Sequence, residues 1–419
     1  MQLDLSKINT SKILSARKVF FIGIGGIGIS ALARMALSRD MIVSGLNDEE
    51  DGKTLETLQE EGVKIIFKKD FKKLPDADLY VYSDAWDFRG PEIIEEAKKT
   101  CKPVLTYFEA LGQFAKEYKV IAIAGTHGKT TTTAMIANIL IDAGLDPTCI
   151  VGSFVKKFKS NFRGGNGEYL VAEADEYNRH FLNFHPFIAV VTNIEADHLD
   201  YYKDLADIQS AFDKFLSQSK NKITDYKKYL GKVPKLSVPG EHNRMNAAAA
   251  LAVADILKID KNKAMKSLAE FSGTWRRLEK KGATKEGTIV YDDYAHHPTE
   301  IKASLQALRE LYPEKKVTVL FQPHLYSRTK ALFDDFAKSF KDADQIFLLP
   351  IFFAREAKDE SVSSEKLAVA IGGSAKSFPD SKSAEHFLKT LPLGRNDVFV
   401  TMGAGEASKI IDDVFTLIK

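Results

Sequence analysis

The chain has 419 residues, more than the roughly 100 to 200 that one domain usually holds, so we expect two or three domains. Its 59 Lys and Arg residues nearly balance 57 Asp and Glu residues, and the net charge of +2 gives no support for a broad nucleic-acid-binding or membrane-binding surface. The hydrophobic fraction of 44% and the charged fraction of 28% are those of a globular protein rather than a disordered one.

The N-terminus and the cysteines bear on where the protein works. Residues 1–7 contain no basic stretch followed by an apolar one, and no later apolar run approaches the roughly 18 residues of a membrane span. We therefore expect a cytoplasmic protein without membrane insertion. Cys101 and Cys149 stand in no metal-ligand or disulfide spacing, and we interpret both as buried small apolar residues.

Short apolar runs alternate with helix-length amphipathic stretches along nearly the whole chain. The runs predict strands at residues 18–22, 41–46, 120–124, 169–172, 188–192, 288–291, 317–321, 345–349 and 398–401. This alternation favours parallel sheets covered by helices, which is an α/β fold. We predict one domain boundary before the strand at Val120 and another near residues 271–273, after an alanine-rich helix.

A glycine-rich turn follows the first predicted strand. It contains Gly23, Gly25, Gly26 and Gly28. This GxGxxG pattern lets a diphosphate approach the N-terminus of the following helix, whose free amides and dipole favour anions. Asp48 stands where a dinucleotide-binding fold places its ribose-binding acid, so the turn alone would suggest NAD. The pattern selects a diphosphate but not a nicotinamide, and a purely structural turn is the alternative.

A second glycine loop joins the strand at residues 120–124 to a helix predicted over residues 134–143. It consists of Gly125, Thr126, His127, Gly128, Lys129, Thr130 and Thr131. A strand, a glycine loop, a lysine, a hydroxyl and a helix, in this order, form the arrangement that cradles nucleotide phosphates. Lys129 would neutralise the phosphates, and Thr130 could reach Mg²⁺. The glycines are closer together than in the general P-loop motif, and a plain turn with an exposed lysine is the alternative.

Two later strand ends supply candidate magnesium ligands. The strand at residues 169–172 leads into Glu173, Asp175 and Glu176, and the strand at residues 188–192 leads into Asp197 and His198. Parallel strands end at the same edge of a sheet, so these groups are expected beside the phosphate loop. We predict Glu173 and His198 as metal ligands. Asp175 and Glu176 could equally be solvated loop acids, and for Asp197 we favour a helix cap.

Eight ordered blocks of the sequence resemble the Mur ligases, the ATP-dependent enzymes that form the amide bonds of the peptidoglycan peptide. Besides the two glycine loops, they are residues 173–176, 192–200, 242–246, 275–279, 292–300 and 322–329. The resemblance implies three consecutive α/β domains. They are a Rossmann-like domain at 1–117 for the UDP-sugar, a P-loop ATPase-like domain at 118–271 for ATP, and a Rossmann-like domain at 272–419 for the amino acid.

Within this family, the chain is most similar to the branch that joins L-alanine to the lactyl carboxylate of UDP-N-acetylmuramate through an acyl phosphate. Residues 292–300 and the Gly-Thr-His-Gly sequence carry this similarity, and Phe212 stands where later-acting members have a carbamylated lysine. A ligase that attaches the murein tripeptide to the same nucleotide sugar is the alternative. Glu300 favours the alanine branch.

The resemblance also implies roles for individual residues. Lys129, Glu173 and His198 would be catalytic, and Mg²⁺ would be bound by Thr130, Glu173 and His198. ATP would contact residues 125–131 together with Asn243, His296 and Arg328. The UDP-sugar would contact the first glycine turn and Arg277. The expected partners are UDP-N-acetylmuramate and L-alanine, with the protein a monomer or a weak homodimer.

Some residues depart from the family pattern or have a simpler interpretation. Residues 44–48 replace the usual Ser-Gly-Ser-Asp, residues 177–179 replace a Ser-Asp continuation, and Leu325 stands where arginine is common. We expect these changes to affect acceptor binding more than the reaction. His296 and His297 precede Pro298 and could instead cap the following helix. A nicotinamide oxidoreductase would leave Lys129 without a role, and a non-catalytic nucleotide-binding module would not need His198 or His296.

Overall fold

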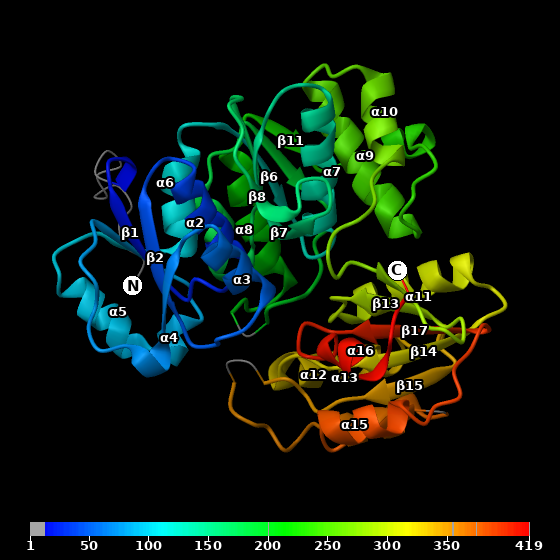
Figure 1. The fold of residues 1–419 in the computed structure, drawn as a ribbon. Coiled ribbons are helices and arrows are strands. Elements are labelled where there is room, and N and C mark those ends of the chain that lie inside the picture. The colour runs from blue at the N-terminus through cyan, green and yellow to red at the C-terminus, as the bar shows by residue number, and fades with distance from the viewer. Residues whose placement is uncertain (1–12, 200, 354–355, 374, 419) are drawn as a thin grey trace. The chain divides into compact units, whose positions relative to one another are not determined.

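The computed structural model describes residues 13–199, 201–353, 356–373 and 375–418, which form three β-sheets with helices around them (Figure 1). Residues 1–7 and Asp200, both used in the sequence analysis, lie outside this range. The chain divides into two compact units. The first unit comprises the described residues of Met1–Ile194, Leu205–Tyr226 and Ala249–Ser267, and the second comprises those of Glu195–Asp204, Lys227–Ala248 and Leu268–Lys419.

The first sheet lies in the first unit and has the order β3-β2-β1-β4-β5, with all neighbours parallel. Its strands are β1 (Lys18–Ile22), β2 (Ile42–Asn47), β3 (Lys64–Phe67), β4 (Leu79–Tyr82) and β5 (Val104–Thr106). The intervening helices are α2 (Ile27–Leu37), α3 (Lys53–Glu60), α4 (Trp86–Arg89), α5 (Pro91–Lys98) and α6 (Tyr107–Ala115), with the 3-10 turn η2 (Lys68–Asp70). Parallel strands need such crossover connections, as the sequence alternation predicted.

The second sheet has the order β11-β10-β6-β9-β7-β8 and is parallel except for the β7–β8 pair. Its strands are β6 (Lys119–Ala124), β7 (Thr148–Val155), β8 (Ser160–Arg163), β9 (Tyr169–Glu173), β10 (Ile188–Val191) and β11 (Asn221–Ile223). The helical segments in this part of the sequence are α7 (Lys129–Asp142), η3 (Tyr177–Asn183), α8 (Leu205–Ser217), η4 (Lys227–Lys232), α9 (Glu241–Ile256) and α10 (Lys261–Ala269). Helix α7 buries an unbroken run from Thr132 to Leu140, because apolar residues occupy nearly all of its faces.

The third sheet lies in the second unit, has the order β12-β13-β17-β14-β15-β16, and is parallel except for β12–β13. Its strands are β12 (Glu279–Ala283), β13 (Ile289–Asp293), β14 (Lys316–Phe321), β15 (Gln345–Leu348), β16 (Ala375–Ser377) and β17 (Asp397–Met402). The helices are α11 (Pro298–Leu311), α12 (Tyr326–Ala331), α13 (Phe333–Ala337), α14 (Ser364–Ile371), α15 (Ser381–Leu388) and α16 (Lys409–Val414).

Alternating strand residues build a core on each face of the third sheet. Val319 and Val400 pack with the apolar residues of α11, α13 and α14. Their neighbours Leu320 and Phe399 pack with those of α15 and α16. A strand sends successive side chains to opposite faces, so a strand covered on both sides has to be apolar throughout. This explains why the sequence shows unbroken apolar runs at these strands.

The α/β class and all nine predicted strands are confirmed, with ends that shift by a residue or two. Strands such as β8, with the sequence Ser-Asn-Phe-Arg, were not predicted because they lack an apolar run. The interpretation of the cysteines is half wrong, since Cys149 is buried but Cys101 is exposed. The domain boundaries at 117/118 and 271/272 stay predictions.

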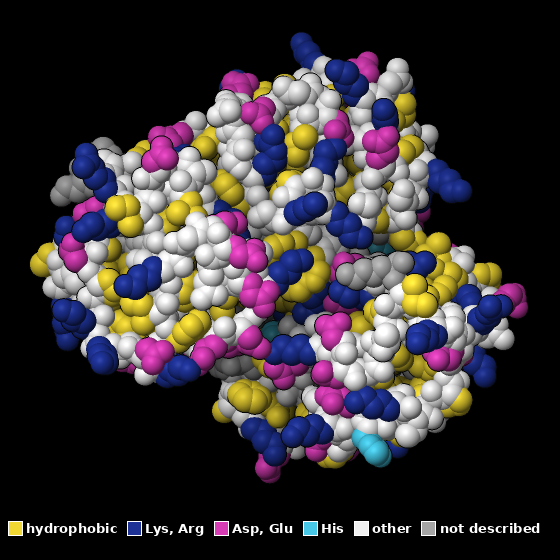
Figure 2. All heavy atoms as spheres, viewed as in Figure 1, with side chains coloured by type: hydrophobic (Ala, Val, Ile, Leu, Met, Phe, Trp, Pro, Cys, Tyr) yellow, Lys and Arg dark blue, Asp and Glu magenta, His cyan; other side chains and the backbone are white. Residues whose placement is uncertain are grey.

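The surface drawn in Figure 2 carries lysines, arginines and acidic side chains interspersed with one another. This mixture agrees with the near balance of charges in the sequence. No helix within the described residues has both the length and the apolar character needed to cross a membrane.

Candidate functional site

The first glycine turn follows β1 in the first unit and is shaped by close neighbours. A Cβ on Gly23 would lie 2.3 Å from Nε1 of Trp86, and one on Gly28 would lie 3.0 Å from the ring of Tyr107. Gly23 also has a φ of 82°, which favours glycine. The turn is therefore tightly packed: Gly23 can be replaced only with strain, and a side chain at Gly28 would have to displace the Tyr107 ring.

The departure from the family pattern at residues 44–48 places an amide side chain beneath this turn. Oδ1 of Asn47 accepts a hydrogen bond of 3.1 Å from the backbone N–H of Gly25, and Asn47 is buried. Asp48, which would hold a ribose in the NAD interpretation, instead pairs with Arg89 at 2.9 Å. The carboxylate of Asp48 thus pairs with an arginine of the protein, whereas the NAD interpretation needs this carboxylate to hold a ribose.

The second glycine loop leaves β6 at the carboxyl edge of the second sheet, beside the ends of β9 and β10. Gly125 has a φ of 133°, and a Cβ there would lie 2.1 Å from Oγ1 of Thr192. Gly128 adopts the left-handed conformation at the N-terminus of α7. The loop is held from β10, where Asn193 accepts hydrogen bonds from the amides of Thr126 and His127 at 3.1 and 2.9 Å. The loop is thus fixed by long-range contacts as well as by its glycines.

Lys129 begins α7 and folds back over the loop. Its Nζ donates to the carbonyl of Gly125 at 2.5 Å and lies 2.9 Å from both carboxylate oxygens of Glu176. The side chain of Glu176 is only 4% exposed. Burial alone would lower the pKa of Lys129, but Glu176 and other nearby carboxylates outweigh it and raise the pKa. Lys129 is therefore a fixed positive charge at the loop.

Thr130 and Glu173 bring a hydroxyl and a carboxylate together at the same edge. Oγ1 of Thr130 donates to Oε2 of Glu173 at 3.0 Å, and the backbone N–H of Gly152 donates to the other carboxylate oxygen. A Cβ on Gly152 would lie 2.8 Å from both oxygens, so a larger residue there would displace this carboxylate. Hard oxygen donors in this arrangement suit Mg²⁺.

The second unit gathers polar groups at the carboxyl edge of its own sheet. The strands β13, β14 and β17 are neighbours there, with Asp293 and Phe321 both paired with Met402 at their ends. Residues 294–297, 322–325 and 403–406 continue from these three strand ends. Parallel strands bring side chains from distant segments to one edge of a sheet, so the residues that follow these three strands lie close together.

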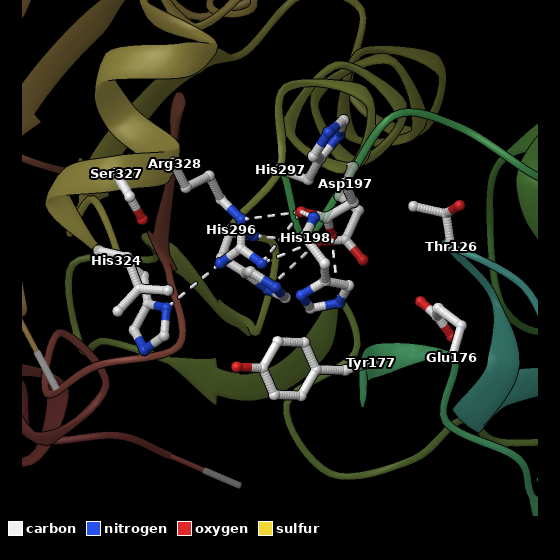
Figure 3. A network of polar contacts seen from close by, with 12 residues as sticks. Thr126, Glu176, Tyr177, Asp197, His198, His296, His297, His324, Ser327 and Arg328 are labelled. Atoms are coloured by element: carbon white, nitrogen blue, oxygen red, sulfur yellow. Dashed lines mark hydrogen bonds and ion pairs between the residues drawn. The ribbon is translucent and has the colours of Figure 1, made fainter. Parts of the chain in front are cut away.

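Asp197 and Arg328 form the centre of this cluster (Figure 3). Nε and Nη2 of Arg328 both lie 3.2 Å from Oδ1 of Asp197, and the two side chains are 7% and 11% exposed. Burial alone would raise the pKa of Asp197, but the charges of His198 and Arg328 outweigh it and lower the pKa. The helix-cap interpretation of Asp197 is wrong, because the next helix, α8, begins only at Leu205.

His296 lies beside the same cluster and is held by its own neighbours. Its backbone N–H donates to Oε2 of Glu300 at 3.1 Å, and its Nδ1 lies 2.9 Å from the carbonyl of Tyr294. Burial lowers the pKa of His296 to about 4, with Glu300 opposing the shift. The imidazole is therefore neutral near pH 7. His297 caps α11 through its Nδ1, which confirms that interpretation for His297.

Arg277 and Asn243 belong to the second unit and are anchored there. Nη1 of Arg277 lies 3.6 Å from Oε1 of Glu300, which ties this arginine to the His296 segment. Asn243 is buried in the first turn of α9 and donates to the carbonyl of Pro239 at 2.6 Å. Its neighbour His242 has a pKa lowered to about 4 by burial.

The structure therefore brings the predicted residues together in two groups. Lys129, Thr130 and Glu173 meet in the first unit, and His198, His296 and Arg328 meet in the second. The glycines of the first turn lie together as their sequence spacing predicted. Sequence reasoning does not decide the role of Glu176 and misses Asp197 as a member of the second group, since only the folded chain reveals their basic partners.

Three family models match the chain, described as "Mur ligase family, catalytic domain" at residues 18–119, "Mur ligase middle domain" at residues 123–230 and "Mur ligase, glutamate ligase domain" at residues 276–405. The UDP-N-acetylmuramate–L-alanine ligase of Clostridium kluyveri is 38% identical, covering 94% of this chain and 97% of the relative. The enzyme of that name from Aquifex aeolicus is 39% identical, covering 94% and 96%.

Solved structures give the same result. The crystal structure of the UDP-N-acetylmuramate-alanine ligase from Thermotoga maritima matches with a TM-score of 0.79 and 28% identity, covering 94% of this chain and 97% of that one. A murein peptide ligase from Psychrobacter arcticus matches with a TM-score of 0.71 and 22% identity, covering 96% and 100%, which is a likeness of fold.

Proposed function

This chain belongs to the Mur ligase family, and on that premise we propose that it joins L-alanine to the lactyl carboxylate of UDP-N-acetylmuramate with ATP. One observation carries the proposal. The Lys129 ammonium and the Thr130–Glu173 pair stand at the end of a glycine loop, in a chain 38% identical over nearly its whole length to ligases of that name. The product would serve peptidoglycan precursor synthesis.

The reaction joins two groups that do not react unaided. A carboxylate oxygen attacks the γ-phosphorus of ATP, ADP leaves, and the acyl phosphate that forms is attacked by the amine, which expels inorganic phosphate. The phosphoryl group and the carboxylate are both anions, so the protein must supply positive charge. Lys129 does so from a fixed position, because its backbone carbonyl and carboxylate partners leave it little freedom.

We propose that Mg²⁺ takes part, with Thr130 and Glu173 as ligands of one ion and His198 as a ligand of a second. The fit is good for the first two, whose hydroxyl and carboxylate oxygens are 3.0 Å apart and are hard donors. When bound, the ion would offset charge on the phosphate oxygens. Glu173 is held ready for this role by the N–H of Gly152.

The remaining binding residues are assigned from their match to the sequence motifs of the family. Residues 125–131, Asn243, His296 and Arg328 would contact ATP, and the first glycine turn and Arg277 would contact the UDP-sugar. Phe212 occupies the place of a carbamylated lysine in later-acting members, and its ring packs at 5.1 Å against Phe181 in the core. We propose a cytoplasmic monomer or weak homodimer, divided at 117/118 and 271/272.

A related function differs from this one only in the amine that the enzyme uses. A murein peptide ligase would use the same sugar nucleotide, but the likeness to the Psychrobacter arcticus ligase is one of fold, whereas the relatives at 38% and 39% identity are named for L-alanine. Phosphate release from ATP and UDP-N-acetylmuramate should be measured with L-alanine, glycine, L-serine and the tripeptide supplied separately.

We expect L-alanine to give the highest kcat/KM in this assay. Preference for the tripeptide would assign the chain to the recycling reaction. If none of these amines stimulates phosphate release, both assignments are contradicted.

A further inference from the structure

The segment between Glu176 and His180 is strained in a way that its sequence does not require. Within η3, Asn178 and Arg179 have φ values of 50° and 57°, so two successive non-glycine residues are left-handed. Each such residue costs about 1 kcal/mol or more. The surroundings must therefore hold this turn in place.

One anchor of the turn comes from the first sheet. Nε2 of His180 lies 2.6 Å from Oδ2 of Asp84, which follows β4. The imidazole also stacks on Phe108 of α6, with ring centroids 4.1 Å apart and 15° between the planes. Both carboxylate oxygens of Asp84 and Nδ1 of His180 are buried and have no hydrogen-bond partner among the described residues, so the close approach of His180 is the polar contact of the Asp84 carboxylate there. Nε2 of His180 also lies 3.3 Å from Nδ2 of Asn178, within the strained turn itself.

A second anchor comes from α8. Nη2 of Arg179 donates to Oδ1 of Asp207 at 2.5 Å. Helix α6 also packs closely on the turn, because a Cβ on Gly112 would lie 2.7 Å from the carbonyl oxygen of Asn183. With Arg179 and His180 anchored in this way, the turn presents Glu176 to Lys129 with both carboxylate oxygens at 2.9 Å from Nζ.

The elements behind Asp84 and Phe108 also touch the first glycine turn. Trp86, two residues after Asp84, packs on Gly23, and Tyr107, next to Phe108, packs on Gly28. Both contacts lie within the first unit. Contacts, together with adjacent positions in the sequence, therefore link the first glycine turn, through Asp84 and His180, to Glu176 and Lys129.

We propose that Asp84 and His180 form a positioning pair that couples occupancy of the first glycine turn to the geometry of Lys129. This inference rests on the proposed function, which places the UDP-sugar at the first turn and ATP at the second. The proposed role of the pair is to hold this turn rather than to bind a ligand. It holds the strained turn so that UDP-sugar binding in one sheet changes ATP affinity in the next, and by thermodynamic reciprocity ATP changes UDP-sugar affinity equally.

The test uses the full chain with Mg²⁺ and a non-hydrolysable ATP analogue, titrated calorimetrically with and without saturating UDP-N-acetylmuramate. We expect the two dissociation constants of the analogue to differ at least fivefold in the unaltered protein. Asp84→Asn, or His180→Phe, which keeps the stack on Phe108, should bring that ratio to within twofold of one. The double variant should match either single variant, because removing one partner already breaks the pair.

The matched control is Asp76→Asn, since Asp76 is 81% exposed and pairs with Lys18 on the surface of the same sheet. It should leave the ratio unchanged. Retention of the ratio in folded single variants, additive effects in the double variant, or loss of folding in both single variants would each contradict the positioning role. A ratio of one in the unaltered protein would also contradict it while leaving the ligase function untouched, whereas failure to bind the analogue at all would contradict the proposed function.

Discussion

The phosphate loop of the first unit and the histidine–arginine cluster of the second differ in how the sequence encodes them. The loop is one continuous segment, in which the strand, glycines, lysine, hydroxyl and helix follow one another. The cluster is assembled from Asp197, His296 and Arg328, which come from three distant segments. A contiguous site can be recognised from a short sequence, whereas an assembled one needs the fold.

The two sites also carry charge differently. In the loop, Lys129 makes close contacts with backbone carbonyls and with Glu176, so one cation has several fixed partners. In the cluster, the charge of Arg328 is matched mainly by one buried carboxylate, that of Asp197. We therefore expect changes in the loop to show chiefly in catalysis, and changes in the cluster to show chiefly in stability.

Replacing Lys129 should give the largest effect. Lys129→Ala removes the cation that we propose binds the phosphates, so kcat/KM for ATP should fall about a thousandfold in steady-state assays of phosphate release. The substitution also removes the Lys129 ammonium from beside the buried Glu176 carboxylate. Lys129→Ala/Glu176→Gln should therefore recover the thermal midpoint without recovering turnover. Lys98→Ala, at a lysine 51% exposed, is the control and should leave kcat/KM unchanged. If Lys129→Ala lowers kcat/KM less than tenfold, the loop does not differ from the cluster in its effect on catalysis.

Breaking the ion pair of the cluster should give the next largest effect. Arg328→Ala leaves Asp197 buried beside fewer cations, so the free energy of unfolding should fall by about 3 to 4 kcal/mol in urea denaturation. Adding Asp197→Asn should cost less than the sum of the single changes. Lys330→Ala, on the same helix but paired with Asp359 at the surface, should cost under about 0.5 kcal/mol. Equal costs for Arg328 and Lys330 would mean that the buried pair contributes nothing.

The same contrast explains which parts of the site the sequence could predict. Lys129, Thr130 and Glu173 stand at strand ends or in a short motif, and their neighbours follow from parallel-sheet geometry. Glu176 was left between a solvated and a functional role, because burial against Lys129 depends on the left-handed turn that follows it. Asp197 was assigned to a helix cap, because its partner Arg328 lies in a segment that only the fold brings near.

The strands, like the site residues, could be predicted from the sequence only in part. Runs such as residues 120–124 are apolar throughout because the strand is covered on both faces, so they stand out in the sequence. Strand β12, with the sequence Glu-Lys-Lys-Gly-Ala, pairs at the edge of its sheet and is not apolar, so it was not predicted. Edge strands depend on pairing with a neighbour rather than on burial.

The pH dependence of stability should sharpen the comparison from the side of the second unit. Burial raises the pKa of Asp293 to about 6, against roughly 3.9 in an unfolded chain. Between these values the folded state binds more protons than the unfolded state, so this carboxyl lowers the free energy of unfolding as the pH rises from about 4 to about 6. His242 and His296 act in the opposite sense, since burial lowers the pKa of each to about 4.

Asp293→Asn removes the first contribution and leaves the histidines. The free energy of unfolding should then rise more steeply with pH than in the unaltered protein, by about 2 to 3 kcal/mol across that window. Denaturation with urea at several pH values measures this difference. Parallel curves for the two proteins would show that Asp293 titrates normally when folded.

The smallest effect is expected at Asp48 of the first unit. Its pair with Arg89 is partly exposed, so Asp48→Ala should change the free energy of unfolding by no more than about 1 kcal/mol. The KM for UDP-N-acetylmuramate should change less than twofold, because the acid is occupied by Arg89 rather than directed at a ribose. A loss of NADH binding on this substitution would instead restore the nicotinamide interpretation.

Isotope transfer tests most directly whether a carboxylate is phosphorylated before the amine attacks. UDP-N-acetylmuramate carrying heavy oxygen in its lactyl carboxylate should be incubated with ATP and L-alanine, and the released phosphate analysed by mass spectrometry. We expect one labelled oxygen in each phosphate and one in each amide product, since the acyl phosphate passes a carboxylate oxygen to phosphorus. Unlabelled phosphate released together with the amide product would contradict the account.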